Sequence, residues 1–372
     1  MSMYIVHLWV LTRFFRRVNS YGFDIKKEYK DVGMIDWLTL RLDLRFLPRD
    51  VIEKLRSKTS TICKISPDGD IDWKSYCWES VRSDTHQVSV RVGGYLYVQG
   101  SPARIGLQNN VFGSLDITYC ANKMILFAAE HLGIDSIPSL EHWTCSRIDV
   151  TRNYQMSSGS EARQALEYIK QTPESRQKHY SESNGFYIGK RSTLHKGKIY
   201  LKGQDAKRNK QMRRAQYTEN QILKAEKLLR AEYTLARHGL NRLLEENNCK
   251  WFELDKEILL RKHTEFFEEY FSDIEVSDMS NILEKLIEVA PTRGRAQSAY
   301  DCYTRIKMYG YSQAKISYSE STWRKHTGYL KKAGFRRADL QMINVTPLRK
   351  RQILLDDAVR CWDDIKLVKE AA

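Results

Sequence analysis

Three segments alternate polar and apolar residues and carry side chains that could act on a phosphate. In KGKIYLKG, the side chains of Lys198, Tyr200 and Lys202 share one face of a strand, because side chains alternate between faces with a period of two. A tyrosine between two lysines lies in a positive field, which favours a phosphate and lowers the phenol pKa from about 10. Tyr200 is therefore a candidate nucleophile, although an ordinary amphipathic surface strand explains the same pattern.

The other two segments each place a carboxylate in the middle of a strand. In TCSRIDVTR, Asp149 shares a face with Arg147, and in LLRAEYTLARHG, Glu232 shares a face with Arg230. Two such acids meeting on one sheet could hold a hard divalent cation together with a substrate phosphate. Surface ion pairs with Arg147 or Arg230 explain the same acids, and the spacing alone does not decide between the two interpretations.

Positive charge is concentrated between the last two segments. Residues 190–214 contain ten Lys and Arg against one acid, Asp205. A solvated charged helix normally intersperses the two signs, so charge of one sign beside a candidate nucleophile predicts a track for the DNA backbone. The candidate contacts outside the tyrosine strand are Lys190, Arg191, Lys207, Arg208, Lys210, Arg213 and Arg214.

The elements that would position these residues form two regions. Alternating runs predict strands near 36–44, 87–99, 145–151, 185–202 and 230–237, and longer amphipathic runs predict helices at 48–57, 119–133 and 160–171. We therefore expect an α+β domain over 34–244, with a central antiparallel β-sheet and flanking helices. A mainly α-helical domain over 245–372 follows, with helices at 253–272, 278–289, 297–309, 319–333 and 351–369. Residues 1–33 are interpreted as an N-terminal extension, which need not be native, because Met34 opens a strongly patterned segment.

Composition restricts the partners. The chain has 61 Lys and Arg against 46 Asp and Glu, a net charge of +15, which favours a phosphate polyanion. No apolar run reaches the roughly 18–20 residues of a membrane span, so no membrane partner is expected. Seven cysteines without a C-x-x-C spacing argue against a zinc ribbon and a redox pair, and they fit a reducing cytoplasm.

A basic helix is expected in the second region. SYSESTWRKHTGYLKKAGF begins with serine caps, and Gly334 would end the helix. With a Trp323 anchor, the pattern fits a helix-turn-helix-like reader of duplex DNA, and the solvated face of a helical bundle fits it too. The candidate DNA contacts are Arg324, Lys325, Lys331 and Lys332.

The order of the motifs resembles a known family. MIDWLTLRL, SPARIGLQNNVFGSLDI, SRIDVT, IYLK and RAEYTLARHGL follow one another between Met34 and Leu240, as in the gene II replication initiators of filamentous bacteriophages, and the resemblance continues to about Arg351. The resemblance implies a rolling-circle initiator that nicks one strand of a duplex origin, leaves a 3′-OH primer and rejoins the displaced strand. By the same resemblance, the nucleophile corresponds to Tyr200, which would form a phosphotyrosine intermediate.

The resemblance also suggests a metal site. Likeness to other rolling-circle initiators assigns Mg²⁺ or Mn²⁺ to Asp149 and Glu232, with Asp36 as a third candidate, while Lys198 and Lys202 would favour the ionised phenol. Many rolling-circle nickases use an H-x-H pair, and none of the nine histidines here has a histidine two places away. Oxygen ligands are therefore expected.

The expected partners follow from this activity. They are duplex and single-stranded DNA at the origin, together with a host helicase and polymerase. The expected location is the cytoplasm of a bacterial host, and the sequence does not decide whether the chain forms a homo-oligomer. Two other functions compete with this one. A non-catalytic DNA-binding regulator would use the same basic residues without chemistry, and a hydrolytic endonuclease would leave no protein–DNA adduct.

Overall fold

The chain folds into two compact units. A computed structural model describes residues 31–57, 59–81, 88–171, 179–212, 216–271, 282–335, 340 and 358–366. The first unit comprises 1–162, 177–266 and 358–372, and the second comprises 163–176 and 267–357. The sequence placed a boundary near Leu244, whereas the first unit continues to Phe266 and takes up the chain again at Ala358.

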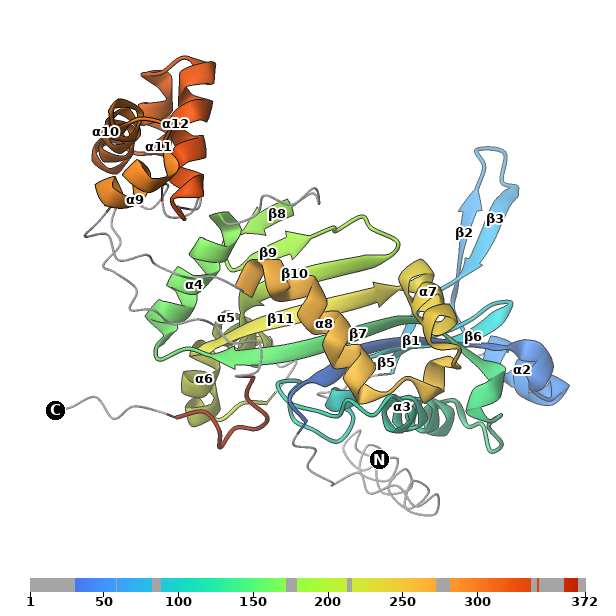
Figure 1. Ribbon diagram of the computed structural model, residues 1–372. Coiled ribbons are helices and arrows are strands. Elements are labelled where there is room, and N and C mark those ends of the chain that lie inside the picture. Colours follow the sequence, from blue (N-terminus) through green and yellow to red (C-terminus); the bar gives the residue numbers. More distant parts are fainter. Residues whose placement is uncertain are drawn as a thin grey trace. The chain divides into compact units, whose positions relative to one another are not determined.

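An antiparallel sheet forms the centre of the first unit (Figure 1). Among the described residues it has nine strands in the order β4-β5-β6-β1-β7-β11-β10-β9-β8. Every neighbouring pair is antiparallel, which confirms the expected α+β class. The strands are β1 Met34–Asp43, β4 Glu79–Val81, β5 Val88–Val92, β6 Tyr95–Gly100, β7 Trp143–Gln155, β8 His179–Glu182, β9 Gly185–Ile188, β10 His195–Leu201 and β11 Leu228–Ala236.

One face of this sheet is apolar and is covered by helices. Leu38, Ile148 and Val150 on this face are fully buried. The helices α3 Ile117–Leu132, α7 Arg237–Asn247 and α8 Lys256–Phe271 belong to this layer, and Figure 1 shows α7 and α8 in front of the sheet. Phe266 of α8 lies so close to Gly197 that a Cβ there would be 2.3 Å from its ring. The close approach of α8 to β10 therefore requires glycine.

The remaining elements of the first unit surround the sheet. They are α2 Arg49–Ser57, a separate hairpin of β2 Thr61–Ile65 and β3 Ile71–Tyr76, α5 Lys202–Gln211 and α6 Glu219–Glu226, with single turns at Leu44–Phe46, Pro102–Arg104, Leu140–His142 and Trp251–Glu253. The helix α4 Gly159–Gln171 begins in the first unit and belongs to the second from Arg163 onward. The predicted helices at 48–57, 119–133 and 160–171 are confirmed, and α3 ends at Gly133 in the left-handed conformation. The hairpin and the helices α5, α6 and α7 were not predicted from the sequence.

The C-terminal segment departs from the prediction. The helix expected over 351–369 is wrong for residues 358–366, where Ala358 forms a β-bridge with Tyr154. Ile365 is 1% exposed and packs into a cluster with Val111, Ala206 and Val359. The apolar residues of the segment 358–366 are therefore buried by packing against the rest of the first unit. The other residues of 351–369 lie outside the described residues.

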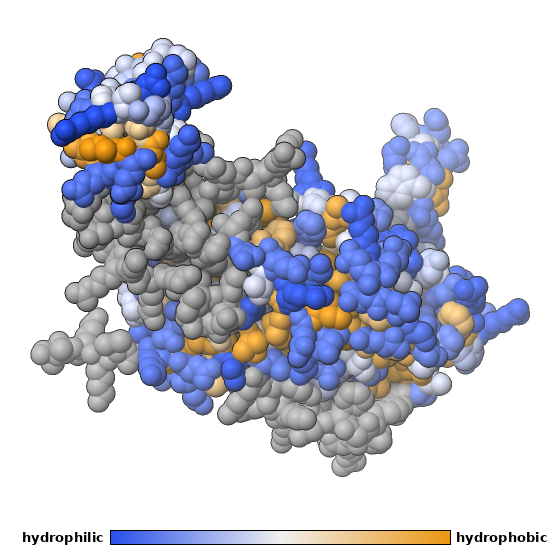
Figure 2. All heavy atoms as spheres, in the orientation of Figure 1, coloured by the Kyte–Doolittle hydropathy of each residue, from blue (hydrophilic) through white to orange (hydrophobic). Residues whose placement is uncertain are grey.

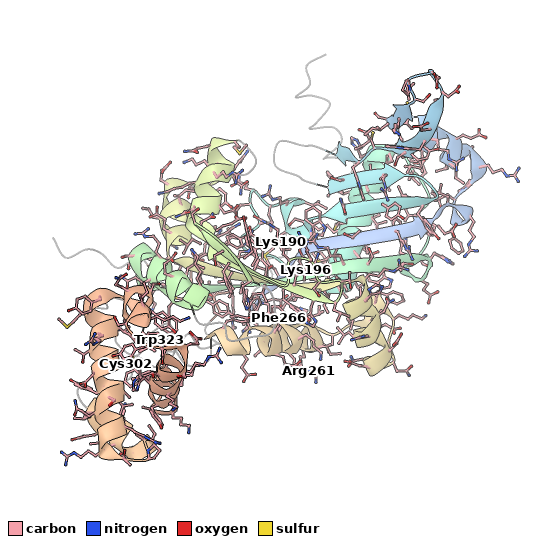
Figure 3. The ribbon with its side chains drawn as sticks, turned by 90° about the horizontal axis from the view of Figure 1, so that it is seen from above. Lys190, Lys196, Arg261, Phe266, Cys302 and Trp323 are labelled. Carbon is pink, nitrogen blue, oxygen red and sulfur yellow. The ribbon has the colours of Figure 1, made fainter. Side chains whose placement is uncertain are left out.

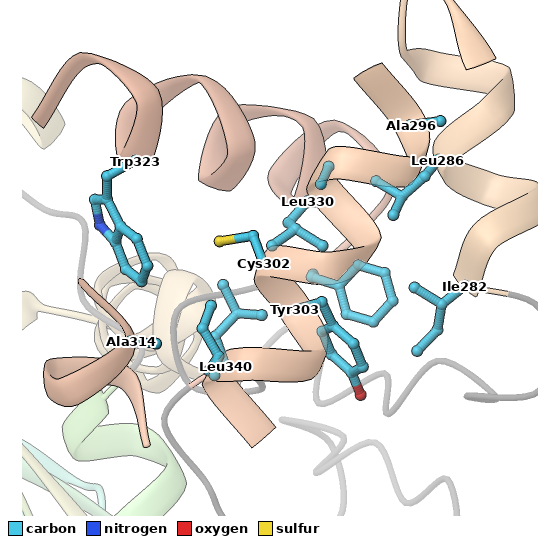
Figure 4. Packing of buried hydrophobic residues seen from close by; sticks show 12 residues of the cluster. Ile282, Leu286, Ala296, Cys302, Tyr303, Ala314, Trp323, Leu330 and Leu340 are labelled. Carbon is cyan, nitrogen blue, oxygen red and sulfur yellow. The ribbon is translucent and has the colours of Figure 1, made fainter. Parts of the chain in front are cut away.

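The second unit is helical, as expected. Its helices are α9 Ile282–Val289, α10 Arg293–Tyr309, α11 Tyr311–Ile316 and α12 Glu320–Lys332. They enclose a core that includes Leu286, Cys302, Trp323 and Leu330 (Figure 4). Ser319 caps α12 by accepting a hydrogen bond from the backbone N–H of Thr322. None of the helices in the described ranges is long and apolar enough to cross a membrane.

Candidate active site

The second face of the sheet brings the predicted residues together. Along β10 and β11, Tyr200 lies opposite Arg230, and Lys198 lies opposite Glu232. Along β11 and β7, Thr234 lies opposite Asp149. Glu232 is therefore a diagonal neighbour of both Tyr200 and Asp149 on the same face, a separation of about 7 Å between backbones that side chains can bridge.

The tyrosine and the glutamate are in direct contact. The Tyr200 hydroxyl donates a hydrogen bond of 2.6 Å to Glu232 Oε1. Lys198 Nζ lies 3.9 Å from the centroid of the tyrosine ring, a cation–π distance. Tyr200 is 5% exposed and the Glu232 side chain is 17% exposed, so solvent reaches this pair through the glutamate.

The sequence predicted that the neighbouring lysines lower the pKa of Tyr200, and this prediction is wrong in direction. Burial, together with the charge of Glu232, raises the pKa of Tyr200 well above 10, and the opposing effect of Arg230 is smaller. A carboxylate that accepts the phenol proton in a hydrogen bond stabilises the neutral phenol, and this outweighs nearby cations. Tyr200 is therefore a neutral hydrogen-bond donor at neutral pH.

A buried arginine lies at the centre of the site. The Arg230 side chain has no exposed surface, and its Nη1 donates to the Asn110 carbonyl at 2.6 Å. Its Nη2 is 3.0 Å from Asp36 Oδ2, and its Nε is 3.3 Å from Glu232 Oε1. Burial favours the neutral form, but the carboxylates of Asp36 and Glu232 raise the pKa of Arg230. The ion pair between Arg230 and Glu232 thus exists, but it is buried rather than on the surface.

The loop that follows β6 holds Asp36. Asp36 Oδ1 accepts hydrogen bonds from Asn110 Nδ2 at 2.9 Å and from Ser101 Oγ at 3.1 Å. Burial raises the pKa of Asp36, but Arg230, Lys202 and the Asn110 hydrogen bond outweigh it and hold this pKa below its usual value. Asp36 therefore acts as the anionic partner of Arg230. Ser101 and Asn110 belong to SPARIGLQNNVFG, which shows what that motif builds.

Lys202 is not placed as predicted. It begins α5 rather than extending β10, and its side chain has no exposed surface. Its Nζ donates to Asp205 Oδ2 at 2.7 Å and to Asn110 Oδ1 at 3.3 Å, and it lies 5.9 Å from the ring centroid of Tyr200. Burial and Arg230 lower the pKa of Lys202. Lys202 therefore links α5 to the Asn110 loop and does not present its charge to a substrate.

Asp149, a predicted metal ligand, is the remaining acid of the site. It accepts hydrogen bonds from Arg147 Nε at 2.8 Å and Nη2 at 2.6 Å. Burial, with a further contribution from Glu232, raises the pKa of Asp149 to about 6 despite Arg147. No group of three His, Cys, Asp or Glu residues that could share a metal exists in the described ranges, so a three-acid site including Asp36 is not formed there.

Two carboxylates nevertheless fit a hard cation. Mg²⁺ is usually bound by one or two carboxylates plus substrate phosphates. Asp149 and Glu232 are diagonal neighbours, and the negative charge of Glu232 disfavours ionisation of Asp149. A divalent cation between them would relieve this repulsion, so the pair suits such an ion.

The predicted basic track is partly neutralised. Lys207 pairs with Glu226, and Lys210 pairs with Glu219, acids of α6 that the count over 190–214 did not include. Lys190, which is labelled in Figure 3 and follows β9, lies 4.5 Å from the ring centroid of Tyr180. Of the other predicted contacts, Arg191 and Arg208 are exposed, and Arg213 and Arg214 lie outside the described residues.

The basic residues of α12 lie on the surface of the second unit. Arg324, Lys325, Lys331 and Lys332 are exposed, whereas Trp323 is 4% exposed and packs in the core. Arg324 Nε is 3.1 Å from Glu320 Oε1. Figure 2 shows hydrophilic residues over much of this unit. The tryptophan anchor is confirmed, and the DNA contacts stay a prediction.

Comparison with known proteins assigns a family. Residues 34–258, well over half of the chain, match the Phage_CRI family, which is described as the N-terminal part of a replication-associated protein. The chain belongs to this family. The matched residues contain the whole Tyr200–Glu232–Arg230 cluster and Asp149, and the membership confirms the resemblance to gene II-type initiators. This Phage_CRI chain is therefore a replication-associated protein.

Two further comparisons complete this picture. No curated protein matches the chain. A solved structure entitled Structure of Rolling Circle Replication Initiator Protein from Geobacillus stearothermophilus is similar, with a TM-score of 0.31 and 11% sequence identity. That similarity covers 67% of this chain and 89% of the other.

Proposed function

We propose that this chain initiates rolling-circle DNA replication by nicking one strand of a duplex origin through Tyr200. The observation that carries the proposal is the 2.6 Å hydrogen bond from the Tyr200 hydroxyl to Glu232 on a sheet face that also holds Lys198 and Asp149. A nucleophile paired with a base is the usual signature of covalent catalysis. Membership of a replication-associated family supports DNA as the substrate.

The nicking step exchanges one phosphate ester for another. The Tyr200 oxygen attacks the scissile phosphorus, a Tyr–O–P bond forms, and the bond from phosphorus to the 3′ oxygen breaks. Because the pKa of Tyr200 is well above 10, its proton must leave during the attack, and Glu232 Oε1 is the acceptor within reach. The leaving 3′ oxygen takes a proton and becomes the 3′-OH primer, while the 5′ end stays on the tyrosine. The ester preserves the bond energy for rejoining the strand.

The surrounding charges favour this reaction. Lys198, which has no carboxylate partner among the described residues, can meet the phosphate as negative charge develops. Arg230, held by Asp36 and Asn110, keeps Glu232 oriented toward the tyrosine. Mg²⁺ or Mn²⁺ bound by Asp149 and Glu232 would polarise a non-bridging phosphate oxygen.

The partners proposed for this reaction follow from its products. The exposed basic residues of α12 would bind the duplex origin. A host polymerase would extend the 3′-OH, and a host helicase would unwind the strand, in the cytoplasm of a bacterial host.

The test compares Tyr200→Phe with Tyr309→Phe, an exposed tyrosine of α10. Each protein is incubated with Mg²⁺ and a supercoiled plasmid that carries the replication region of the chain's own genome. We expect Tyr309→Phe and the parent to give nicked circles with protein attached, and Tyr200→Phe to bind DNA without nicking. Nicking by Tyr200→Phe refutes the assignment. No nicking by the parent supports a regulator, and nicking without an adduct supports a hydrolytic endonuclease.

A further inference from the structure

Beyond the Tyr200 site, the open face of the sheet continues over β7, β1, β6 and β5. This part carries a cluster that the proposed chemistry does not use. Arg41 on β1 and Arg91 on β5 both lie opposite Tyr97 on β6, which places the three side chains in one row on the same face. Tyr95 on β6 and Trp78 beside β4 extend the row. We call these five residues the arginine–aromatic surface.

The contacts within this surface are continuous. The Arg91 guanidinium carbon lies 4.9 Å from the ring centroid of Trp78 and 4.5 Å from that of Tyr97. The Arg41 guanidinium carbon lies 5.0 Å from the centroid of Tyr95. Tyr97 makes edge contacts with Trp78 at 5.9 Å and with Tyr95 at 6.0 Å between centroids. Arginines and rings therefore alternate across three strands.

The charges of this surface are available to a ligand. Neither Arg41 nor Arg91 forms an ion pair with a carboxylate in the part of the chain that the structure describes. Trp78 is 39% exposed and Tyr95 is 37% exposed, although aromatic side chains usually bury most of their surface. An arginine stacked on a ring keeps N–H groups at its edge for a phosphate oxygen. The surface thus offers ring faces and phosphate donors side by side.

We infer that the arginine–aromatic surface binds single-stranded DNA, with bases stacked on the aromatic rings and phosphates on Arg41 and Arg91. Aromatic rings interleaved with cations on an open sheet are the means by which proteins bind unpaired strands. A duplex keeps its bases inside and could use only the arginines. The inference rests on the proposed function in one respect, because it names where the strand processed at Tyr200 would run.

The distance to Tyr200 suits one continuous strand. Four strand spacings separate β10 from β6, about 19 Å at roughly 4.8 Å each. The register also places Tyr200 level with Asn153 of β7 and Tyr97 level with Thr144, about 30 Å apart along the strands at roughly 3.3 Å per residue. The two sites are therefore about 35 Å apart, and since a DNA strand advances about 3.4 Å per nucleotide even when stacked as in a duplex, about ten nucleotides or fewer cover this distance. Arg147, whose guanidinium carbon is 5.5 Å from the ring centroid of Trp37, lies between the two sites on the same face. Arg147 and Trp37 therefore connect Asp149 to the arginine–aromatic surface on this face of the sheet.

The experiment uses the full chain with Tyr200→Phe as parent, so that no strand is cut. The fluorescence anisotropy of a labelled oligothymidylate reports the Kd, and unlabelled duplex serves as competitor. Tyr97→Leu should raise the Kd roughly 5- to 150-fold, the range for loss of one stacked base. Arg91→Gln should weaken binding and reduce the slope of log K against log salt by about 0.7, the value for one lost phosphate contact. Arg56→Gln, an exposed arginine of α2, is the charge-matched control and should change neither quantity.

The outcomes separate this inference from the proposed function. Thermal melting shows whether each variant is folded; if Tyr97→Leu does not fold, the salt slope of Arg91→Gln decides. An unchanged Kd and salt slope in folded variants overturns the inference, as does duplex that competes as well as the single strand. If the Tyr200 protein nicks its origin while these variants bind normally, the proposed function stands and this inference fails. If the variants lose binding while the Tyr200 protein does not nick, the inference stands and the proposed function fails.

Discussion

Replacing Glu232 by glutamine tests the assigned proton acceptor. The variant keeps the shape of the side chain and a hydrogen-bond acceptor for Tyr200, but it removes the base. Because burial and Glu232 hold the pKa of Tyr200 well above 10, fewer than about one phenol in 300 is ionised at pH 7.5. A positioned general base contributes about 100- to 10,000-fold. Glu232→Gln should therefore slow nicking by that factor, about 3–5 kcal/mol in activation free energy.

The variant should fold and bind DNA, because Arg230 keeps Asp36 and the Asn110 carbonyl as partners. The assay is single-turnover nicking of supercoiled plasmid, with binding measured in parallel, and Glu219→Gln, at an exposed position of α6, is the control. The residual rate of Glu232→Gln should rise about tenfold per pH unit above pH 7, because only spontaneous ionisation of the phenol remains. A nicking rate equal to that of the Glu219→Gln control would refute the reasoning.

Three further predictions concern the metal, pH and stability. Asp149→Asn removes one of the two proposed metal carboxylates, so the Mg²⁺ concentration for half-maximal nicking should rise tenfold or more, and an unchanged midpoint contradicts this. His263 is buried, and burial lowers its pKa to about 3. Its contribution to stability is present above an unfolded pKa of about 6.5 and is lost as pH falls, about 3 kcal/mol by pH 4.5. Urea unfolding at pH 7 and 4.5 should show this loss in the parent and not in His263→Gln; equal losses contradict it. Ile365→Ala should lower the unfolding free energy by about 2–5 kcal/mol in denaturant titration, and a loss below about 1 kcal/mol means that the segment is not docked.

The sequence predicted those parts of the fold that depend on local patterns. The alternation of polar and apolar residues in β1, β7, β10 and β11 can be read from the sequence. Burial follows it clearly in β1, whereas β7 and β11 also bury polar residues of the site such as Asp149 and Arg230. The same alternation placed Tyr200 and Glu232 on polar faces. The helices of the second unit follow from amphipathic spacing and from the Ser319 cap.

The interior of the site could not be predicted, because it depends on register and on a distant loop. Nothing in β10 and β11 alone shows that Lys198 lies opposite Glu232, which brings the tyrosine hydroxyl to the carboxylate. The burial of Arg230 depends on Asn110, which is 120 residues away in the chain. Local charge therefore gave the wrong direction for the pKa of Tyr200, since the dominant contacts come from burial and a neighbouring strand.

Two other differences between the predicted and the observed fold have separate causes. The β2–β3 hairpin had a readable signal, since Pro67-Asp68-Gly69 is a turn sequence between two strand-like runs. The C-terminal segment had no such signal. An apolar pattern that suits a helix also suits the packing of Val359 and Ile365 into a cluster with Val111 and Ala206. Only tertiary packing distinguishes the two.

Peptide mapping of the covalent protein–DNA product tests the central claim most directly. The parent protein is allowed to nick its origin, the complex is digested with protease and nuclease, and the nucleotide-bearing peptide is sequenced by mass spectrometry. The account predicts one modified peptide with the nucleotide on Tyr200. A nucleotide on any other residue, or nicked DNA with no modified peptide, would contradict it.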